Sequence, residues 1–96
     1  MIKYDVVFKK IGDMVYISHL DLMLMFRRAI RRSGMPFVLT KGFSPRVKIS
    51  IPKALKLGVS SETEVMSLWL IREVDRDAVI KAINSELPEG VQLVSG

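Results

Sequence analysis

The side chains best suited to chemistry lie at the two ends of one segment, residues 18–32. His19 is the only histidine and occupies the first position of a predicted helix, where free backbone N–H groups attract anions. It fits a phosphate contact or a proton shuttle, and it equally fits a ring packed beside Met23. Arginines stand at positions 27, 28, 31 and 32, and guanidinium groups bind phosphate. Anion binding is therefore the first chemistry that this segment indicates.

One flank of the same predicted helix combines leucines with arginines. Leu20, Leu24, Arg27 and Arg31 follow each other at spacings of three and four, so they share a flank outside the buried stripe. An apolar surface beside arginine is typical of a docking site. In the alternative interpretation, the loop at residues 41–58 covers both leucines.

A second candidate site is the run Lys-Gly-Phe-Ser-Pro-Arg at residues 41–46. Glycine permits close approach of a backbone, and Phe43 offers a ring that could stack on a base. The run does not match a P-loop, which needs Gly-x-x-x-x-Gly-Lys-Ser/Thr, and a packed irregular loop is the alternative. The side chains that the sequence offers to an anion or a nucleic acid are His19, Arg27, Arg31, Lys41, Phe43, Ser44, Arg46 and Lys48.

Composition excludes several classes of function. The chain has no cysteine, which removes disulfides, iron–sulfur clusters, thiolate metal sites and cysteine nucleophiles. One histidine cannot build a histidine-rich metal site, and no nucleophile elbow or Ser/His/Asp set appears in a recognisable context. We therefore expect no catalytic residue, no cofactor and no metal ion. The net charge of +5 favours phosphate or an acidic partner.

Length and hydropathy predict one small domain. The chain has 96 residues, of which 49% are hydrophobic, and this is too apolar for a disordered protein. No apolar run approaches the roughly 18 residues of a membrane span, and the N-terminus lacks the apolar region of a signal peptide. We expect a cytoplasmic protein without a membrane partner. Its single domain, residues 1–96, is either complete or the N-terminal part of a longer domain.

Local patterns place these residues on six elements. Alternation over residues 2–9 predicts a strand, and Ser18 with Asp21 is the N-terminal signature of a helix over residues 18–33. A broken strand at residues 37–51 and strands at 63–71 and 91–94 follow, with a second helix beginning at Asp75.

The order β-α-β-β-α-β predicts an α+β, ferredoxin-like sandwich with two helices on one face of an antiparallel sheet. The alternative is another α+β arrangement in which residues 41–58 form a hairpin of their own.

The other sheet face is a further candidate. If helices cover the face with Val6 and Phe8, alternation leaves on the open face Lys3, Val7, Lys9, Arg46, Lys48 and Trp69. RNA-recognition sheets hold single strands with such aromatic and basic groups, although their aromatic signature is absent here. This face could equally pack against a partner through Trp69.

Five blocks, residues 8–12, 16–22, 27–36, 42–50 and 57–64, resemble the uncharacterised radical-SAM-linked domain family. The Ser-His-Leu-Asp and Gly-Phe-Ser-Pro pieces are specific in combination. That family occurs alone or behind radical-SAM proteins, near ribosomal-protein and ribonuclease genes, which implies an accessory role near RNA. The cysteines of the radical-SAM motif are missing, so the chain is not the radical enzyme. Its domain is usually longer, and Val47 stands where a proline is expected.

These observations predict a non-enzymatic accessory module that binds RNA, with Phe43 or Trp69 stacking on bases. The alternative is a docking domain for a radical-SAM partner, through Leu20, Leu24 and Trp69. An enzyme built on His19 is a third hypothesis. The oligomeric state is not indicated by any pattern.

Overall fold

The computed structural model describes residues 1–52 and 61–94, and of residues 61–63 the backbone alone. The elements in chain order are β1 (Ile2–Lys10), the 3-10 helix η1 (Gly12–Tyr16), α1 (His19–Arg32), β2 (Ile49–Ser50), β3 (Ser61–Leu70), α2 (Arg76–Asn84) and β4 (Val91–Val94). Residues 53–60, between the strands predicted at 37–51 and 63–71, lie outside the described residues. No helix in the described part of the chain is long and apolar enough to cross a bilayer.

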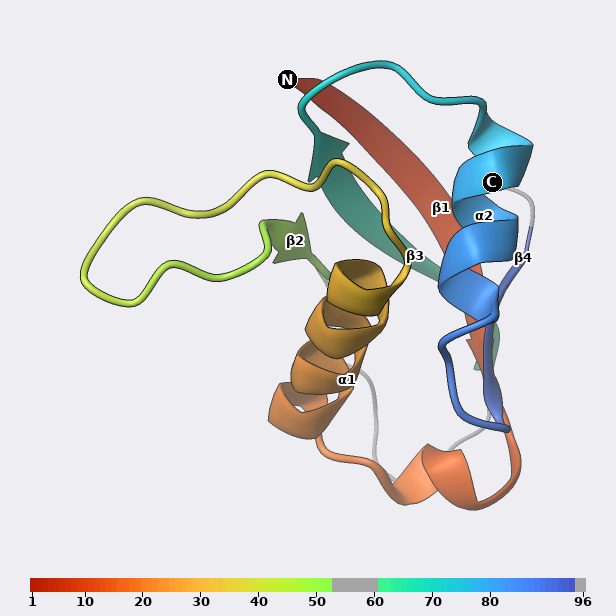
Figure 1. Ribbon diagram of the computed structural model, residues 1–96. Coiled ribbons are helices and arrows are strands. Elements are labelled where there is room, and N and C mark those ends of the chain that lie inside the picture. Colours follow the sequence, from red (N-terminus) through yellow and green to blue (C-terminus); the bar gives the residue numbers. More distant parts are fainter. Residues whose placement is uncertain (53–60, 95–96) are drawn as a thin grey trace.

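The four strands form one antiparallel sheet in the order β2-β3-β1-β4. Both helices lie on the same face of this sheet (Figure 1). This arrangement is the predicted α+β fold, and it is consistent with a ferredoxin-like sandwich. Residues two apart on a strand share a face, so the covered face of β1 carries Tyr4, Val6 and Phe8.

The core lies between the sheet and the helices. Phe8 of β1 meets Phe26 of α1 edge to face, with the ring centroids 5.0 Å apart. The aliphatic residues Ile30 of α1 and Ile83 of α2 are both fully buried in the same cluster. Each helix therefore contributes one apolar stripe to a shared core, and its other side faces outward.

Side chains at the helix starts explain where α1 and α2 begin. Ser18 Oγ accepts a hydrogen bond from the Asp21 backbone N–H at 3.1 Å, and Asp75 Oδ2 accepts one from the Ala78 N–H at 3.3 Å. Each bond satisfies an N–H group that has no partner inside its helix. Both predicted N-caps are confirmed, and α1 ends within one residue of the predicted boundary.

The edge strand differs from the prediction. Only Ile49 and Ser50 form β2, while Phe37 makes an isolated bridge to Leu70 of β3. Between these two contacts the chain leaves the sheet as an arm, which we define as residues 38–48 and which projects beyond the body of the molecule (Figure 1).

The arm is held by bonds within itself and, at its first residue, by the Val38 N–H, which donates to the Trp69 carbonyl of β3 at 3.1 Å. The Thr40 N–H donates to the Arg46 carbonyl and the Lys48 N–H to the Val38 carbonyl, both at 2.7 Å. The predicted alternation is therefore present, but its two halves pair with each other instead of continuing along β3.

Candidate nucleic-acid interface

Two arginines of α1 contact the base of the arm. The Arg27 Nε–H donates to the Val47 carbonyl at 3.2 Å. One helical turn later, the Arg31 guanidinium lies over the Phe37 ring, 5.5 Å from its centroid. These contacts join the outer side of α1 to the arm, so that cationic groups from two distant stretches of sequence lie on one surface.

The charged side chains of this surface are all cations, and no nearby carboxylate of the described residues neutralises them. Burial lowers the pKa of the Arg27 guanidinium, and the nearby Arg46 charge lowers it further. Arginine remains protonated at neutral pH, so both groups stay positive. In the described part of the chain, Arg27, Arg31, Lys41 and Arg46 have no carboxylate within ion-pair distance.

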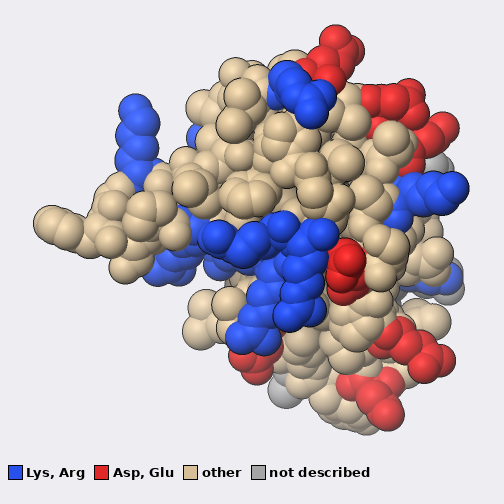
Figure 2. Space-filling view, viewed as in Figure 1, with Lys and Arg blue, Asp and Glu red and all other residues tan. Residues whose placement is uncertain are grey.

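The same pattern is visible in Figure 2, where Lys and Arg side chains gather across α1 and the base of the arm. Most of the Asp and Glu side chains in that view lie elsewhere, toward the side of the molecule that carries α2. The charge of the molecule is therefore unevenly distributed, and its positive region coincides with the contact between α1 and the arm.

The tip of the arm presents an aromatic ring to solvent. Phe43 has an exposed fraction of 109%, and Lys41 and Ser44 beside it are also exposed. Gly42 has a φ of 129°, a conformation that side-chain-bearing residues rarely adopt, which explains the glycine at the turn. The alternative that this loop packs against the body does not hold for Phe43.

We define the α1–arm surface as Arg27, Arg31, Lys41, Phe43, Ser44 and Arg46. The structure brings Arg27 of the helix close to Arg46 of the predicted loop and leaves Phe43 exposed at the tip of the arm. The role of these residues in binding stays a prediction. They do not include His19 or Lys48, which the sequence placed in the same set.

His19 lies at the opposite end of α1 from the contact with the arm. It begins the helix, eight residues before Arg27, which is about 12 Å along the axis. Its ring is half-buried, and Nδ1 is buried without a hydrogen-bond partner among the described residues. The start of α1 and the tip of the arm lie apart in Figure 1. The structure thus does not bring His19 together with Phe43 and Arg46.

Leu20 and Leu24 form an exposed apolar ridge on α1. Their exposed fractions are 81% and 45%, so the alternative in which a loop covers them is wrong. Leu24 also lines a groove of about 520 Å³ between α1 and the residues after α2. The groove is also lined by Arg28 and Arg32, and by residues that the sequence did not indicate as parts of a site, among them Met14, Ile17, Met25, Glu86 and Leu87. The spacing of Arg28 and Arg32 is visible in sequence, but the opposing wall arises only when α2 packs nearby.

Residues 3–96 match the family described as "Uncharacterized protein conserved in bacteria (DUF2344)". The chain belongs to this family. Comparison with curated proteins gave no match, and comparison with solved structures gave none. The description of DUF2344 states no activity, so a function for this member has to be argued from its surfaces.

The open sheet face carries a second set of the predicted residues. Lys3, Val7 and Lys9 alternate with the buried residues of β1, and Trp69 alternates with those of β3. The side chain of Lys48 reaches this face and lies over the Trp69 ring. Arg46, which we expected on the same face, lies in the arm outside the sheet because the chain has left β3 at that point. This DUF2344 domain therefore has two separate basic surfaces.

Proposed function

We propose that this protein is a non-enzymatic module that binds single-stranded RNA through the α1–arm surface. The observation that carries the proposal is the set of four cations, Arg27, Arg31, Lys41 and Arg46, which lack carboxylate partners in the described residues and lie along α1 and the arm that carries the exposed ring of Phe43. Phosphate contacts supply most of the affinity of such complexes, and they come from Lys and Arg side chains.

The chemistry of binding follows from the geometry of these groups. The guanidinium of Arg27 uses Nε for the Val47 carbonyl, and its two terminal nitrogens remain for a phosphate. Contact with Phe37 orients Arg31 in a similar way. Phe43 extends beyond both, so a base can stack on its ring while neighbouring phosphates meet Lys41 and Arg46.

A projecting arm binds an extended single strand of RNA more readily than a duplex. RNA recognition by aromatic stacking needs bases that are unpaired and unstacked. The family resemblance described for the sequence adds a context, because it implies an accessory role near ribosome-related RNA beside radical-SAM proteins. We therefore take single-stranded RNA from the translation machinery as the ligand class to test first.

The experiment is a binding titration of labelled single-stranded RNA, followed by fluorescence anisotropy, with two double variants. Lys41→Ala with Arg46→Ala removes two cations of the α1–arm surface. The matched control removes Lys9 and Lys81. Lys9 lies where β1 pairs with β4, at the sheet edge opposite to β2, and Lys81 is exposed on α2. Each pair reduces the net charge from +5 to +3, so non-specific attraction falls equally.

We expect the arm variant to lose about tenfold in affinity, because the loss of two phosphate contacts removes about that much at moderate salt. The control is expected to lose less than about twofold. Equal losses in the two variants would mean that net charge, and not this surface, determines binding.

A second candidate function is protein docking, and the exposed leucine ridge favours it. Leu24 lines the groove between α1 and the end of α2, and Leu20 lies one turn before it on the same flank of α1. The groove combines apolar side chains with Arg28 and Arg32, so it suits a partner helix that has an apolar face and acidic flanks. The resemblance noted for the sequence makes a radical-SAM protein the partner to test.

Leu24→Glu tests the docking function, with Lys81→Glu as the control on α2. Co-purification with the radical-SAM protein should be lost in Leu24→Glu alone, and the thermal midpoint of both variants should remain close to that of the wild type. If Leu24→Glu retains the partner, the ridge is not its docking site.

A further inference from the structure

The open face of the sheet contains an ordered row of three side chains. Lys3 of β1 lies opposite Trp69 of β3, and Lys48 approaches the same ring from the other side, since the next residue, Ile49, pairs with Leu68. Lys48 Nζ lies 4.8 Å from the centroid of the Trp69 ring, and Lys3 Nζ lies 5.8 Å from it. We call this set the Lys48–Trp69–Lys3 row.

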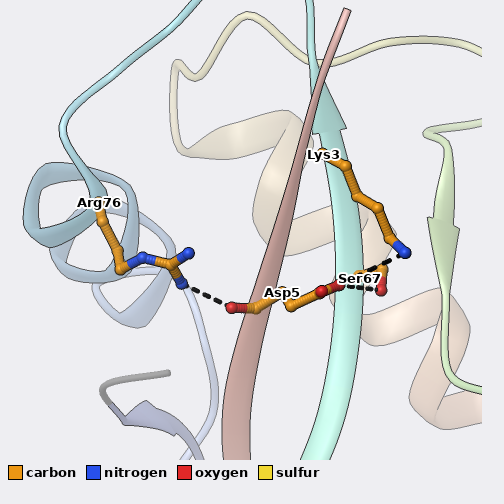
Figure 3. A network of polar contacts seen from close by, with 4 residues as sticks. All are labelled: Lys3, Asp5, Ser67 and Arg76. Atoms are coloured by element: carbon orange, nitrogen blue, oxygen red, sulfur yellow. Dashed lines mark hydrogen bonds and ion pairs between the residues drawn. The ribbon is translucent and has the colours of Figure 1, made fainter.

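The surroundings fix the row in place. Figure 3 shows Lys3 leaning toward Asp5, at 3.8 Å, while the Ser67 hydroxyl donates to the same carboxylate at 2.5 Å. On the opposite side of β1, Arg76 donates to the Asp5 carbonyl, which anchors this part of the strand to α2. Asp5 partly neutralises Lys3, whereas Lys48 has no carboxylate partner among the described residues.

Neither folding nor the proposed α1–arm contacts account for this arrangement. Trp69 is only half-buried on a face that no described helix covers, and two cations converge on its ring. This set is complementary to a nucleotide, because the lysines can turn from the ring to phosphates on either side, which frees the face of the indole for a base to stack on.

We propose that the Lys48–Trp69–Lys3 row is a second contact site for single-stranded RNA, in which one base stacks on Trp69. This inference rests on the proposed function and extends it to the other face of the sheet. Lys48 connects the two surfaces, because its backbone N–H closes the base of the arm while its side chain lies on Trp69. An RNA strand on the arm therefore needs only to pass the edge at β2 to reach the row.

Trp69 is the only tryptophan of the chain, so its emission reports directly on this site. The test titrates the full chain with a short labelled oligouridylate and follows the anisotropy of the label and the emission of Trp69 in parallel. We expect both signals to change with the same midpoint. Bound oligouridylate should also protect Trp69 from quenching by acrylamide.

A pair of variants tests the lysines. Lys3→Ala with Lys48→Ala should weaken binding by about fivefold or more, because two phosphate contacts are lost. The control, Lys9→Ala with Lys81→Ala, removes the same charge and should change affinity less than about twofold. Lys9 is the more informative of the two control positions, because it lies on the same sheet face as the row but opposite Gln92, away from Trp69.

The outcomes separate this inference from the proposed function. If anisotropy reports binding while Trp69 emission and acrylamide access stay unchanged, the row is not a contact site and the α1–arm surface stands. If RNA changes Trp69 emission but the Lys3→Ala, Lys48→Ala and Lys9→Ala, Lys81→Ala variants bind with equal affinity, the two lysines do not contact phosphate. The proposed Lys48–Trp69–Lys3 row would then be wrong. If anisotropy reports no binding at all, the proposed function and this inference both fail.

Discussion

The two helices of this protein are built alike on their buried sides and differently on their exposed sides. Both begin at a capping side chain and both place fully buried aliphatic residues in the common core. The exposed side of α2 mixes Asp77 with Lys81, and its first residue, Arg76, is engaged with β1. The exposed side of α1 carries arginines and two leucines, and it contacts the arm.

The difference shows which residues folding explains. Capping and burial account for most of α2, so its sequence needs no ligand. In α1 the same two requirements account for Ser18 and the buried stripe, and contacts with Val47 and Phe37 hold Arg27 and Arg31 against the arm. They do not explain why these two cations lack carboxylate partners among the described residues, or why Leu20 and Leu24 are exposed. Exposed leucines and mutually repelling arginines lower the stability of the folded protein, so we expect a functional site where both occur.

The largest expected effect tests the common core. Ile30→Ala in α1 and Ile83→Ala in α2 should each lower the free energy of unfolding by about 2–5 kcal/mol, because both side chains are fully buried and leave a cavity. Chemical denaturation measures both. A loss below about 1 kcal/mol in one helix alone would mean that the two helices do not share the core equally.

The next effect separates the exposed sides. Arg31 and Lys81 are exposed cations in the last turns of their helices, so Arg31→Glu and Lys81→Glu disturb the helix dipole and the net charge alike. RNA affinity should fall about tenfold or more in Arg31→Glu, since a phosphate contact becomes a repulsion. In Lys81→Glu, RNA affinity should fall by no more than about threefold. A loss of affinity as large as that of Arg31→Glu would contradict the assignment of RNA binding to the exposed side of α1.

A smaller effect is expected at the helix starts. Ser18→Ala and Asp75→Ala should each reduce stability by about 1 kcal/mol, since each removes the acceptor for a backbone N–H. Thermal unfolding measures the loss of stability. Ser18→Ala should leave RNA affinity unchanged, because the start of α1 lies far from the arm. A large change in affinity would mean that the start of α1 is part of the binding site.

The smallest effect is expected at the ridge. Leu24→Glu should change the free energy of unfolding by less than about 0.5 kcal/mol, because Leu24 is exposed and lies outside the core cluster. Its thermal midpoint is the measurement. If this variant unfolds, Leu24 supports the core, and the docking candidate loses its basis.

Local chemistry made much of the fold predictable. Ser18 and Asp75 marked the helix starts, because a cap acts on backbone groups only three residues away. The order of elements then restricted the sheet to few topologies. The arm was not predictable in the same way, since period-two alternation specifies a strand but not its partner, and Leu39 pairs with Val47 instead of β3.

The candidate site was predictable in its parts and not in its assembly. The residue types of Arg27, Arg46 and Phe43 indicated contact with nucleic acid. The proximity of Arg27 and Arg46 depends on a hydrogen bond between α1 and the arm, which spans 20 residues and leaves no local signature. For the same reason, the sequence grouped His19 with the arm, although a helix end and a distant loop meet only if tertiary packing brings them together.

The most direct test of the central claim is the salt dependence of RNA binding. Four phosphate contacts by Arg27, Arg31, Lys41 and Arg46 contribute about −2.8 to the slope when the logarithm of the association constant is plotted against that of salt concentration, and contacts by Lys3 and Lys48 would add about −1.4. The Lys41→Ala, Arg46→Ala variant should give a slope shallower than that of the wild type by about 1.4, and the Lys9→Ala, Lys81→Ala variant should keep the wild-type slope. A wild-type slope shallower than about −1, or one slope for all three proteins, would contradict the account.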